Sequence, residues 1–325
     1  MNIPSMLRAA VLALLAAAAP VFASEPAVVY EAVQYDDSFN VAANEGIERY
    51  KQAFGAARQG FGASAIERMA RAGHDPVIAI GFALAPEVER VAALYPAVRF
   101  TIIDAVVERP NVQSIVFKEH EGAYLVGLLA ALASRSGTVG FIGGMDIPVI
   151  RNFRCGFEHG ARAAGRPVQV LAATVGSTPA AFNDPEQGAQ LAEQQFAHGA
   201  DVVFAAAGGS GLGAYKAAKQ RGRLAIGVDR NQNFLYPGTM LTSMVKRVDT
   251  AVYLAAIEAR DQRNGTRQAR VSLGLKEQGV SWALDRHNRA LVTPAMQARI
   301  EAAARDVVSG AVQVDAERPG GGCGK

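Results

Sequence analysis

Two aspartates and one lysine stand at positions from which they could hold a polar ligand. Asp104 ends the apolar run VRFTIID, Asp229 ends LAIGVD, and Lys246 lies in LTSMVKRVD. An ionised carboxylate only accepts hydrogen bonds, so the aspartates suit hydroxyl groups that donate. Lys246 can donate three hydrogen bonds and balance the two negative charges. Since Asp is also common as the cap of a helix or loop, a structural role for both aspartates stays open.

Two aromatic residues stand at the beginnings of predicted helices. Phe39 follows Asp37 and Ser38, either of which is the expected helix cap, and Phe182 lies in STPAAFNDPEQG. Each ring could stack on a flat ligand, a contact worth roughly 1–3 kcal/mol per base. By spacing alone, Phe39 fits a hydrophobic staple better, and Phe182 could pack inside its own loop.

Two turns of small residues follow predicted strands. In TVGFIGGMDIPVIRNF, a strand leads through Gly143 and Gly144 into a helix, with Asp146 at the expected N-cap. The run AAGGSGLG contains Gly208 and Gly209, which let the backbone approach a ligand closely. It lacks the G-K-[ST] of a P-loop and the spacing of a dinucleotide fingerprint. Ligands bind at the carboxyl ends of strands in open parallel sheets, so both turns are candidate contacts.

The composition and the motifs argue against several function classes. A net charge of +3 over 325 residues is too small to indicate nucleic-acid binding. The five histidines lack metal-binding spacing, and no G-x-S-x-G nucleophile motif occurs. We therefore expect a binding protein without metal, cofactor or catalytic residues.

Apolar strand patterns alternate with helical patterns of roughly 10–15 residues, which predicts an α/β protein with parallel sheets. The series restarts near Thr138, which predicts two similar lobes. The predicted strands are 27–33, 76–82, 98–104, 112–117, 138–143, 168–175, 201–206, 224–229, 240–245 and 271–275. The predicted helices are 38–54, 64–72, 86–94, 121–134, 184–198, 212–220, 248–261 and 294–308, with one more after Ile147.

Four stretches in combination resemble one known family. FIGGMDIPVIRNF, AAGGSGLG, SMVKRVD and DDSFN are similar to motifs of the basic membrane protein family, the PnrA-like substrate-binding proteins of ABC importers. The resemblance extends over roughly Ala27 to Asp249. It implies a type I periplasmic-binding protein fold, in which two Rossmann-like lobes are joined by a three-strand hinge and the ligand lies in the cleft.

The resemblance also implies roles for the candidate residues. Phe39 and Phe182 would stack on the base of a purine nucleoside. Asp104 and Asp229 would grip the ribose with the help of Lys246. The further implied contacts are Asn40, Met145, Asp146, Gly208 and Gly209.

One segment departs from the family pattern. Family members usually carry an aspartate before D-x-S-F-N that reads the purine edge, but here the segment is VVYEAVQYDDSFN. Tyr30 or Glu31 takes the corresponding place. Glu31 could accept a hydrogen bond from a purine N–H, which Tyr30 could not do equally well. The departure leaves the identity of the base open.

The implied fold gives lobe boundaries. We predict an N-terminal lobe of residues 24–118 and 247–275, and a C-terminal lobe of residues 119–246 and 276–318. The chain would cross between the lobes near 117–120, 244–247 and 274–278. Residues 319–325 would form a flexible tail.

The N-terminus and the two cysteines give information on the cellular compartment of the protein. Arg8 precedes an apolar run, and VFA fits signal-peptide cleavage after Ala23, so residues 1–23 are a predicted signal peptide. No cysteine lies near the cleavage site, so there is no lipobox, and we expect a soluble periplasmic protein. Cys155 and Cys323 are unclustered and make no metal site. We expect two free thiols, with Cys323 in a mobile tail.

The predicted function is a periplasmic receptor. It would bind a purine nucleoside in the cleft and deliver it to the permease subunits of an ABC importer, working as a monomer. A free nucleobase such as adenine is the alternative ligand. A nucleoside-processing enzyme is the rival class, and the missing dinucleotide fingerprint and the export signal argue against it. A ligand-sensing regulator is a third class, but no helix-turn-helix is present.

Overall fold

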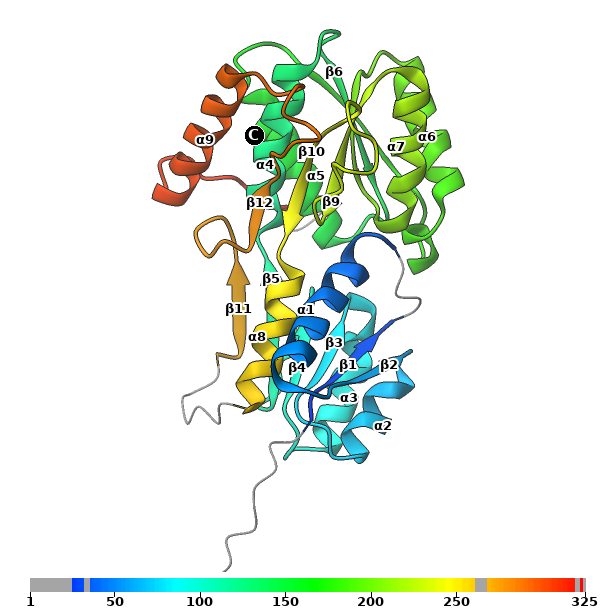
Figure 1. Ribbon diagram of the computed structural model, residues 1–325, viewed down its shortest axis with the longest axis vertical. Coiled ribbons are helices and arrows are strands. Elements are labelled where there is room, and N and C mark those ends of the chain that lie inside the picture. Colours follow the sequence, from blue (N-terminus) through cyan, green and yellow to red (C-terminus); the bar gives the residue numbers. More distant parts are fainter. Residues whose placement is uncertain (1–24, 32–35, 261–267, 319–321, 324–325) are drawn as a thin grey trace, which may run out of the picture.

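The computed structural model describes residues 25–31, 36–260, 268–318 and 322–323. The predicted signal peptide, residues 1–23, lies outside this part. Figure 1 shows two lobes, one above the other along the longest axis, each built around its own sheet. Among the described residues, no helix is both long and apolar enough to cross a membrane.

The sheet of the first lobe has six parallel strands in the order β11-β5-β4-β3-β1-β2. Its helices cover both faces, because the core residues of α1 and α8 belong to one apolar cluster and those of α2 and α3 to another. The strands are β1 (Ala27–Tyr30), β2 (Arg58–Phe61), β3 (Val77–Ile80), β4 (Phe100–Ile103), β5 (Val112–Phe117) and β11 (Arg270–Leu273). The helices are α1 (Phe39–Phe54), α2 (Ser64–Arg71), α3 (Ala85–Leu94) and α8 (Val248–Arg260).

The sheet of the second lobe has the order β12-β10-β9-β8-β6-β7, and only β12 is antiparallel to its neighbour. Helices α4 and α5 pack on one face and α6 and α7 on the other, while α9 lies against α4. The strands are β6 (Thr138–Gly143), β7 (Gln169–Thr174), β8 (Val202–Ala206), β9 (Leu224–Asp229), β10 (Met240–Lys246) and β12 (Val280–Trp282). The helices are α4 (Glu119–Ala133), α5 (Pro148–Arg162), α6 (Pro185–Ala197), α7 (Gly211–Arg221) and α9 (Pro294–Ser309).

The predicted α/β class with two mostly parallel sheets is confirmed. The chain passes between the lobes after β5, after β10 and after β11, and the three predicted crossings overlap these passages. Two short strands were not predicted. In β2, the sequence RQGF carries little apolar pattern, and β12 is only three residues long. The residue boundaries given for the lobes stay a prediction.

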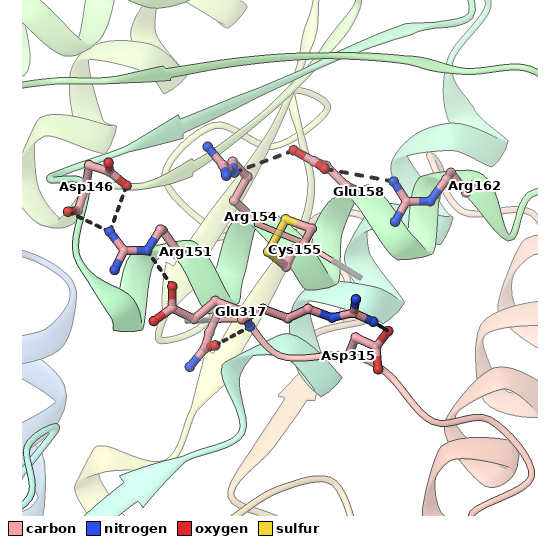
Figure 2. Close-up of a disulfide and its surroundings, with 11 residues drawn as sticks. Asp146, Arg151, Arg154, Cys155, Glu158, Arg162, Asp315 and Glu317 are labelled. Carbon is pink, nitrogen blue, oxygen red and sulfur yellow. Dashed lines mark hydrogen bonds and ion pairs between the residues drawn. A yellow bond between two sulfur atoms is a disulfide. The ribbon is translucent and has the colours of Figure 1, made fainter. Parts of the chain in front are cut away.

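The prediction of two free thiols is wrong. Cys155, buried in α5, forms a disulfide with Cys323 at an S–S distance of 2.04 Å (Figure 2). The two cysteines are 168 residues apart, so only the fold brings them together. The flexible tail predicted for residues 319–325 lies mostly outside the described residues, which include only Gly322 and Cys323 of it, and it stays a prediction.

Candidate functional site

A cavity of about 430 Å³ lies where the carboxyl ends of the strands from both lobes face each other. This volume is within the range of roughly 300–1,000 Å³ that is common for small-molecule sites. Its wall is mostly apolar and includes four aromatic rings, those of Phe39, Phe82, Phe153 and Phe182. The polar side chains around it are those of Glu31, Asp36, Asn40, Asp104, Asn183, Asp229 and Lys246.

The two predicted aspartates face this cavity from opposite lobes. Asp104 directly follows β4 and Asp229 ends β9. One oxygen of Asp104 accepts a hydrogen bond from Lys246 Nζ at 2.5 Å. Its other oxygen, Oδ1, is buried and has no hydrogen-bond partner. Asp229 Oδ2 accepts a hydrogen bond from Ser38 Oγ at 2.5 Å. Both carboxylates are therefore at the cavity wall with acceptor capacity left.

Lys246 is the cation of the site and is only 2% exposed. Its ammonium lies 3.2 Å from Glu119 Oε1 in addition to its bond with Asp104. It also lies 5.3 Å from the ring centre of Phe39 and 5.7 Å from that of Phe153. Cation–π contacts of this kind become stronger when both groups are removed from water.

Burial and charge together shift the pKa values in this cluster. Burial alone would lower the pKa of Lys246, but Asp104, Glu119 and Asp229 outweigh it and raise that pKa, so the lysine stays charged. Burial raises the pKa of Asp229 to about 6, against the opposing effects of Lys246 and of the hydrogen bond from Ser38. Burial also raises the pKa of Glu119, and Lys246 opposes this.

The first turn of α1 differs from the predicted cap. Neither Asp37 nor Ser38 caps the helix with its side chain. Instead, the Asp36 carboxylate accepts hydrogen bonds from the backbone N–H groups of Ser38, Asn40 and Val41. Ser38 is thereby free to donate to Asp229 in the other lobe. The D-x-S-F-N stretch contributes to the site through Asp36 and Ser38 as well as through Phe39.

Phe182 packs closely against the backbone of two glycines, Gly144 and Gly208. A Cβ atom on Gly144 would be 2.3 Å from the Phe182 ring, and one on Gly208 would be 3.0 Å from the Phe182 carbonyl oxygen. Gly208 also has a positive φ of 55°, which favours glycine. Phe182 makes an edge contact with Phe82 of the first lobe, with ring centres 6.2 Å apart. Gly144 and Gly208, one from each predicted turn, thus leave the space that Phe182 occupies.

Four predicted contacts do not line the cavity. Tyr30 is fully buried and stacks on Phe61, so Glu31 alone of that pair faces the cavity. Gly209 packs near Asn183 instead.

Met145 and Asp146 line a separate hollow of about 200 Å³. Helix α5 begins at Pro148, as predicted, but Asp146 is not its N-cap and pairs with Arg151 at 3.2 Å instead.

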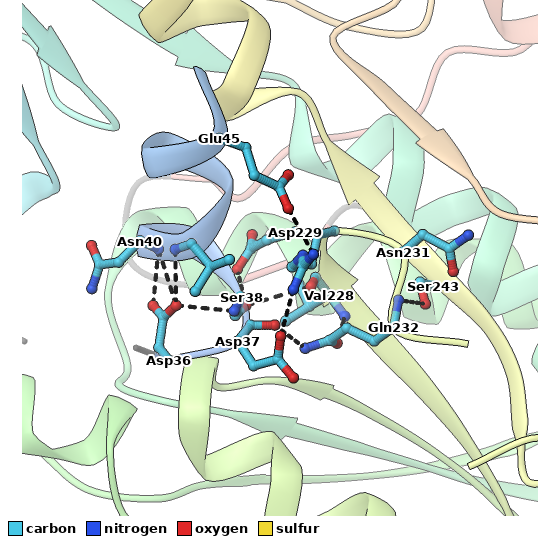
Figure 3. A network of polar contacts seen from close by, with 12 residues as sticks. Asp36, Asp37, Ser38, Asn40, Glu45, Val228, Asp229, Asn231, Gln232 and Ser243 are labelled. Atoms are coloured by element: carbon cyan, nitrogen blue, oxygen red, sulfur yellow. Dashed lines mark hydrogen bonds and ion pairs between the residues drawn. The ribbon is translucent and has the colours of Figure 1, made fainter. Parts of the chain in front are cut away.

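Polar contacts also join the two lobes at the rim of the cavity (Figure 3). Arg230 binds Asp37 at 2.5 Å and Glu45 at 2.7 Å, and both acidic residues belong to the first lobe. The Gln232 side chain donates to the Asp37 carbonyl oxygen at 2.7 Å. With the Ser38–Asp229 bond, these contacts form what we call the interlobe latch: Asp37, Ser38, Glu45, Asp229, Arg230 and Gln232.

Sequence reasoning missed Glu119, Phe82 and Phe153 as parts of the site. Glu119 is 2% exposed and pairs with Lys246, and its place at the start of α4, two residues after β5 at a crossing, was an available signal. Phe82 follows the end of β3, as Phe39 and Phe182 follow other strands. Phe153 lies inside a helix, where an aromatic residue gives no sign of facing a ligand.

Comparison with known proteins gives consistent matches. Residues 23–314 match the family Bmp, described as ABC transporter substrate-binding protein PnrA-like. Basic membrane protein B of Borreliella burgdorferi is 32% identical over 269 residues, which are 77% of this chain and 78% of that protein. The CD4+ T-cell-stimulating antigen of Listeria monocytogenes is 30% identical over 315 residues, which are 87% and 85% of the two chains. A solved ABC transporter solute-binding protein from Aeropyrum pernix has a TM-score of 0.82 at 26% identity, covering 91% of this chain and 94% of that one.

Proposed function

The chain belongs to the PnrA-like family of ABC transporter substrate-binding proteins, and from this premise we propose that it is a receptor for a purine nucleoside. Membership of the family implies a small-molecule ligand and transporter subunits as partners. In the proposal, the base stacks between Phe39 and Phe182, and the ribose lies against Asp104, Asp229 and Lys246. Glu31, on the cavity wall, accepts a hydrogen bond from the base.

The observation that carries this proposal is the excess of acceptors over donors in an aromatic cavity. Asp104 Oδ1 is buried without a hydrogen-bond partner, and an unpaired buried polar atom costs roughly 1–3 kcal/mol. A ligand hydroxyl would remove that cost by donating to it. Vicinal hydroxyls on a sugar can serve Asp104 and Asp229 together, while a flat base fits between aromatic rings.

The same charges disfavour a phosphorylated ligand. Glu31, Asp36, Asp104 and Asp229 all face the cavity, and Lys246, the single cation among the described residues that line it, is already paired. A phosphate group would meet uncompensated carboxylates in a partly buried site. We therefore propose nucleosides and not nucleotides as the ligands.

The proposed mechanism is closure of the lobes around the ligand. The interlobe latch joins surfaces that separate when the cleft opens, and a ligand that contacts both lobes shifts the population toward the closed state. The closed form then delivers the nucleoside to the permease without chemistry on the ligand. We propose a monomer that is exported to the periplasm after cleavage following Ala23, and the Cys155–Cys323 disulfide suits such an oxidising compartment.

Mass spectrometry of the ligand released from natively purified protein tests the proposal. The expected result is a purine nucleoside. Release of a free nucleobase would agree with the stacking assignment but contradict the ribose assignment. A sugar, an amino acid, or conversion of added nucleoside to base and ribose would overturn the proposed function.

A further inference from the structure

The last residues of the chain lie beyond residues 23–314, the part that matches the family. The described residues of this end pack against the protein. Val312 and Val314, at the end of the matched part, pack partly buried against the main core cluster, and Asp315 and Glu317 lie beside α5 (Figure 2). We call the described residues 311–318, together with Gly322 and Cys323, the C-terminal strap.

Three contacts attach the strap to α5 within about one turn. Glu317 Oε2 accepts from Arg151 Nε at 2.5 Å, and the Glu317 backbone N–H donates to Asn152 Oδ1 at 3.0 Å. Cys323 is bonded to Cys155. The side chains of Arg151 and Glu317 are only 20% and 17% exposed, so this ion pair is partly shielded from water.

The same part of α5 forms a wall of the ligand cavity. Val149, Ile150 and Phe153 line it, and Phe153 also lies near the Lys246 ammonium. Residues that touch the strap therefore alternate along α5 with residues that touch the cavity. Both sets lie within the first two turns of α5, so a displacement of this segment would move them together.

We propose that the C-terminal strap positions the first two turns of α5 as a wall of the binding cavity, with Glu317 and Cys323 as positioning residues. The disulfide closes a long loop and stabilises the fold globally in any case. The proposal adds a local effect: without the strap, α5 shifts or opens at its N-terminal turn, and the cavity loses its shape on that side. The predicted effect of the strap on ligand affinity rests on the nucleoside-binding function proposed above.

Hydrogen exchange of the ligand-free protein tests the local effect without any ligand. We expect Cys323→Ser, or reduction of the wild-type disulfide, to speed amide exchange over residues 151–158 by roughly 10-fold more than it speeds exchange over α7. Helix α7 is the internal reference because it lies on the opposite face of the same sheet. If amide exchange is accelerated equally in both helices, or not at all in α5, the strap has no local effect on α5 and the proposal is overturned.

Calorimetric titration with adenosine, guanosine and inosine tests the effect on affinity. Measured where all variants are folded, Cys323→Ser should weaken the best of these ligands by about 3- to 30-fold. Glu317→Ala should weaken it less, and Glu317→Gln should restore part of the loss by keeping an acceptor for Arg151. Arg318→Ala is the matched control, since Arg318 lies on the same strap and, among the described residues, its largely exposed side chain forms its ion pair with Asp315, at 3.6 Å.

The two proposals fail in different ways. If the wild type binds none of the nucleosides, the proposed function fails, and the exchange experiment still decides whether the strap positions α5. If nucleosides bind the wild type and Cys323→Ser with equal affinity, the strap proposal is overturned and the proposed function stands.

Discussion

Asp104 and Asp229 occupy the same position in two different sheets. Each stands at the carboxyl end of the third strand, counted from β11 in one sheet and from β12 in the other. Each also has a left-handed backbone, with φ of 68° and 66°. Asp adopts this conformation more readily than most residues, so the two lobes present matching carboxylates to one cavity.

Replacing either carboxylate should separate nucleoside binding from base binding. Asp104→Asn and Asp229→Asn each replace an acceptor oxygen by a donor, which leaves a ribose hydroxyl unpaired. We expect the nucleoside affinity to fall by roughly one to two decades, while that of the matching free base changes much less. Calorimetry with both ligands measures this, with Asp306→Asn in α9 as a control. Equal losses for nucleoside and base would mean that the aspartates hold the base or the fold.

The stacking assignment predicts a loss of affinity in Phe39→Ala and Phe182→Ala. Each should weaken binding of nucleoside and of base alike, by roughly 1–3 kcal/mol. Phe182→Ala should also lower the melting temperature somewhat, because its ring packs on Gly144. Phe61 is the control, because its half-exposed ring is not part of the cavity wall. Phe61→Ala should leave affinity unchanged. Unchanged affinity in both cavity variants would mean that these rings only pack against the core.

The interlobe latch predicts that Arg230→Gln favours the open form. The variant loses two ion pairs between the lobes, each worth roughly 0–1 kcal/mol since the partners are partly exposed. Small-angle scattering should show a larger radius of gyration for the ligand-free variant, and nucleoside affinity should fall modestly. Arg221→Gln removes an arginine that pairs with Glu193 inside the second lobe and should change neither. An unchanged radius together with unchanged affinity would contradict a role for the latch.

The raised pKa of Asp229 predicts opposite effects of pH on binding and on stability. Its pKa is about 6 because burial disfavours the charged form. Lowering the pH from about 7 to about 5 protonates it, so nucleoside affinity should fall through this window. The stability that this group gives the ligand-free protein is present at low pH and is lost as the pH rises through about 6. Asp229→Asn should remove the contribution of this group to the pH dependence of affinity and of stability. If the pH profile of affinity is the same in this variant as in the wild type, the assignment is contradicted.

Much of the fold followed from periodicity, since strands such as β6 and β9 are largely apolar runs bounded by turns. Site residues at strand ends were also predictable, because topology alone places Asp104 and Asp229 at a cleft. Residues whose role depends on packing between distant segments were not. Phe153 faces the cavity from within a helix, and Cys323 finds its partner 168 residues away. Met145 and Asp146 lie in the turn before α5, where they line the separate hollow, and the motif alone did not distinguish this hollow from the main cavity.

The most direct measurement is calorimetric titration of unfolded and refolded, ligand-free protein with a matched set of compounds. The set contains adenosine, guanosine and inosine, their free bases, ribose, and the nucleoside 5′-monophosphates. We predict that at least one purine nucleoside binds more tightly than its base, and that ribose and the monophosphates bind poorly or not at all. Binding of a monophosphate or of ribose in preference to every nucleoside would contradict an aromatic, carboxylate-lined nucleoside site.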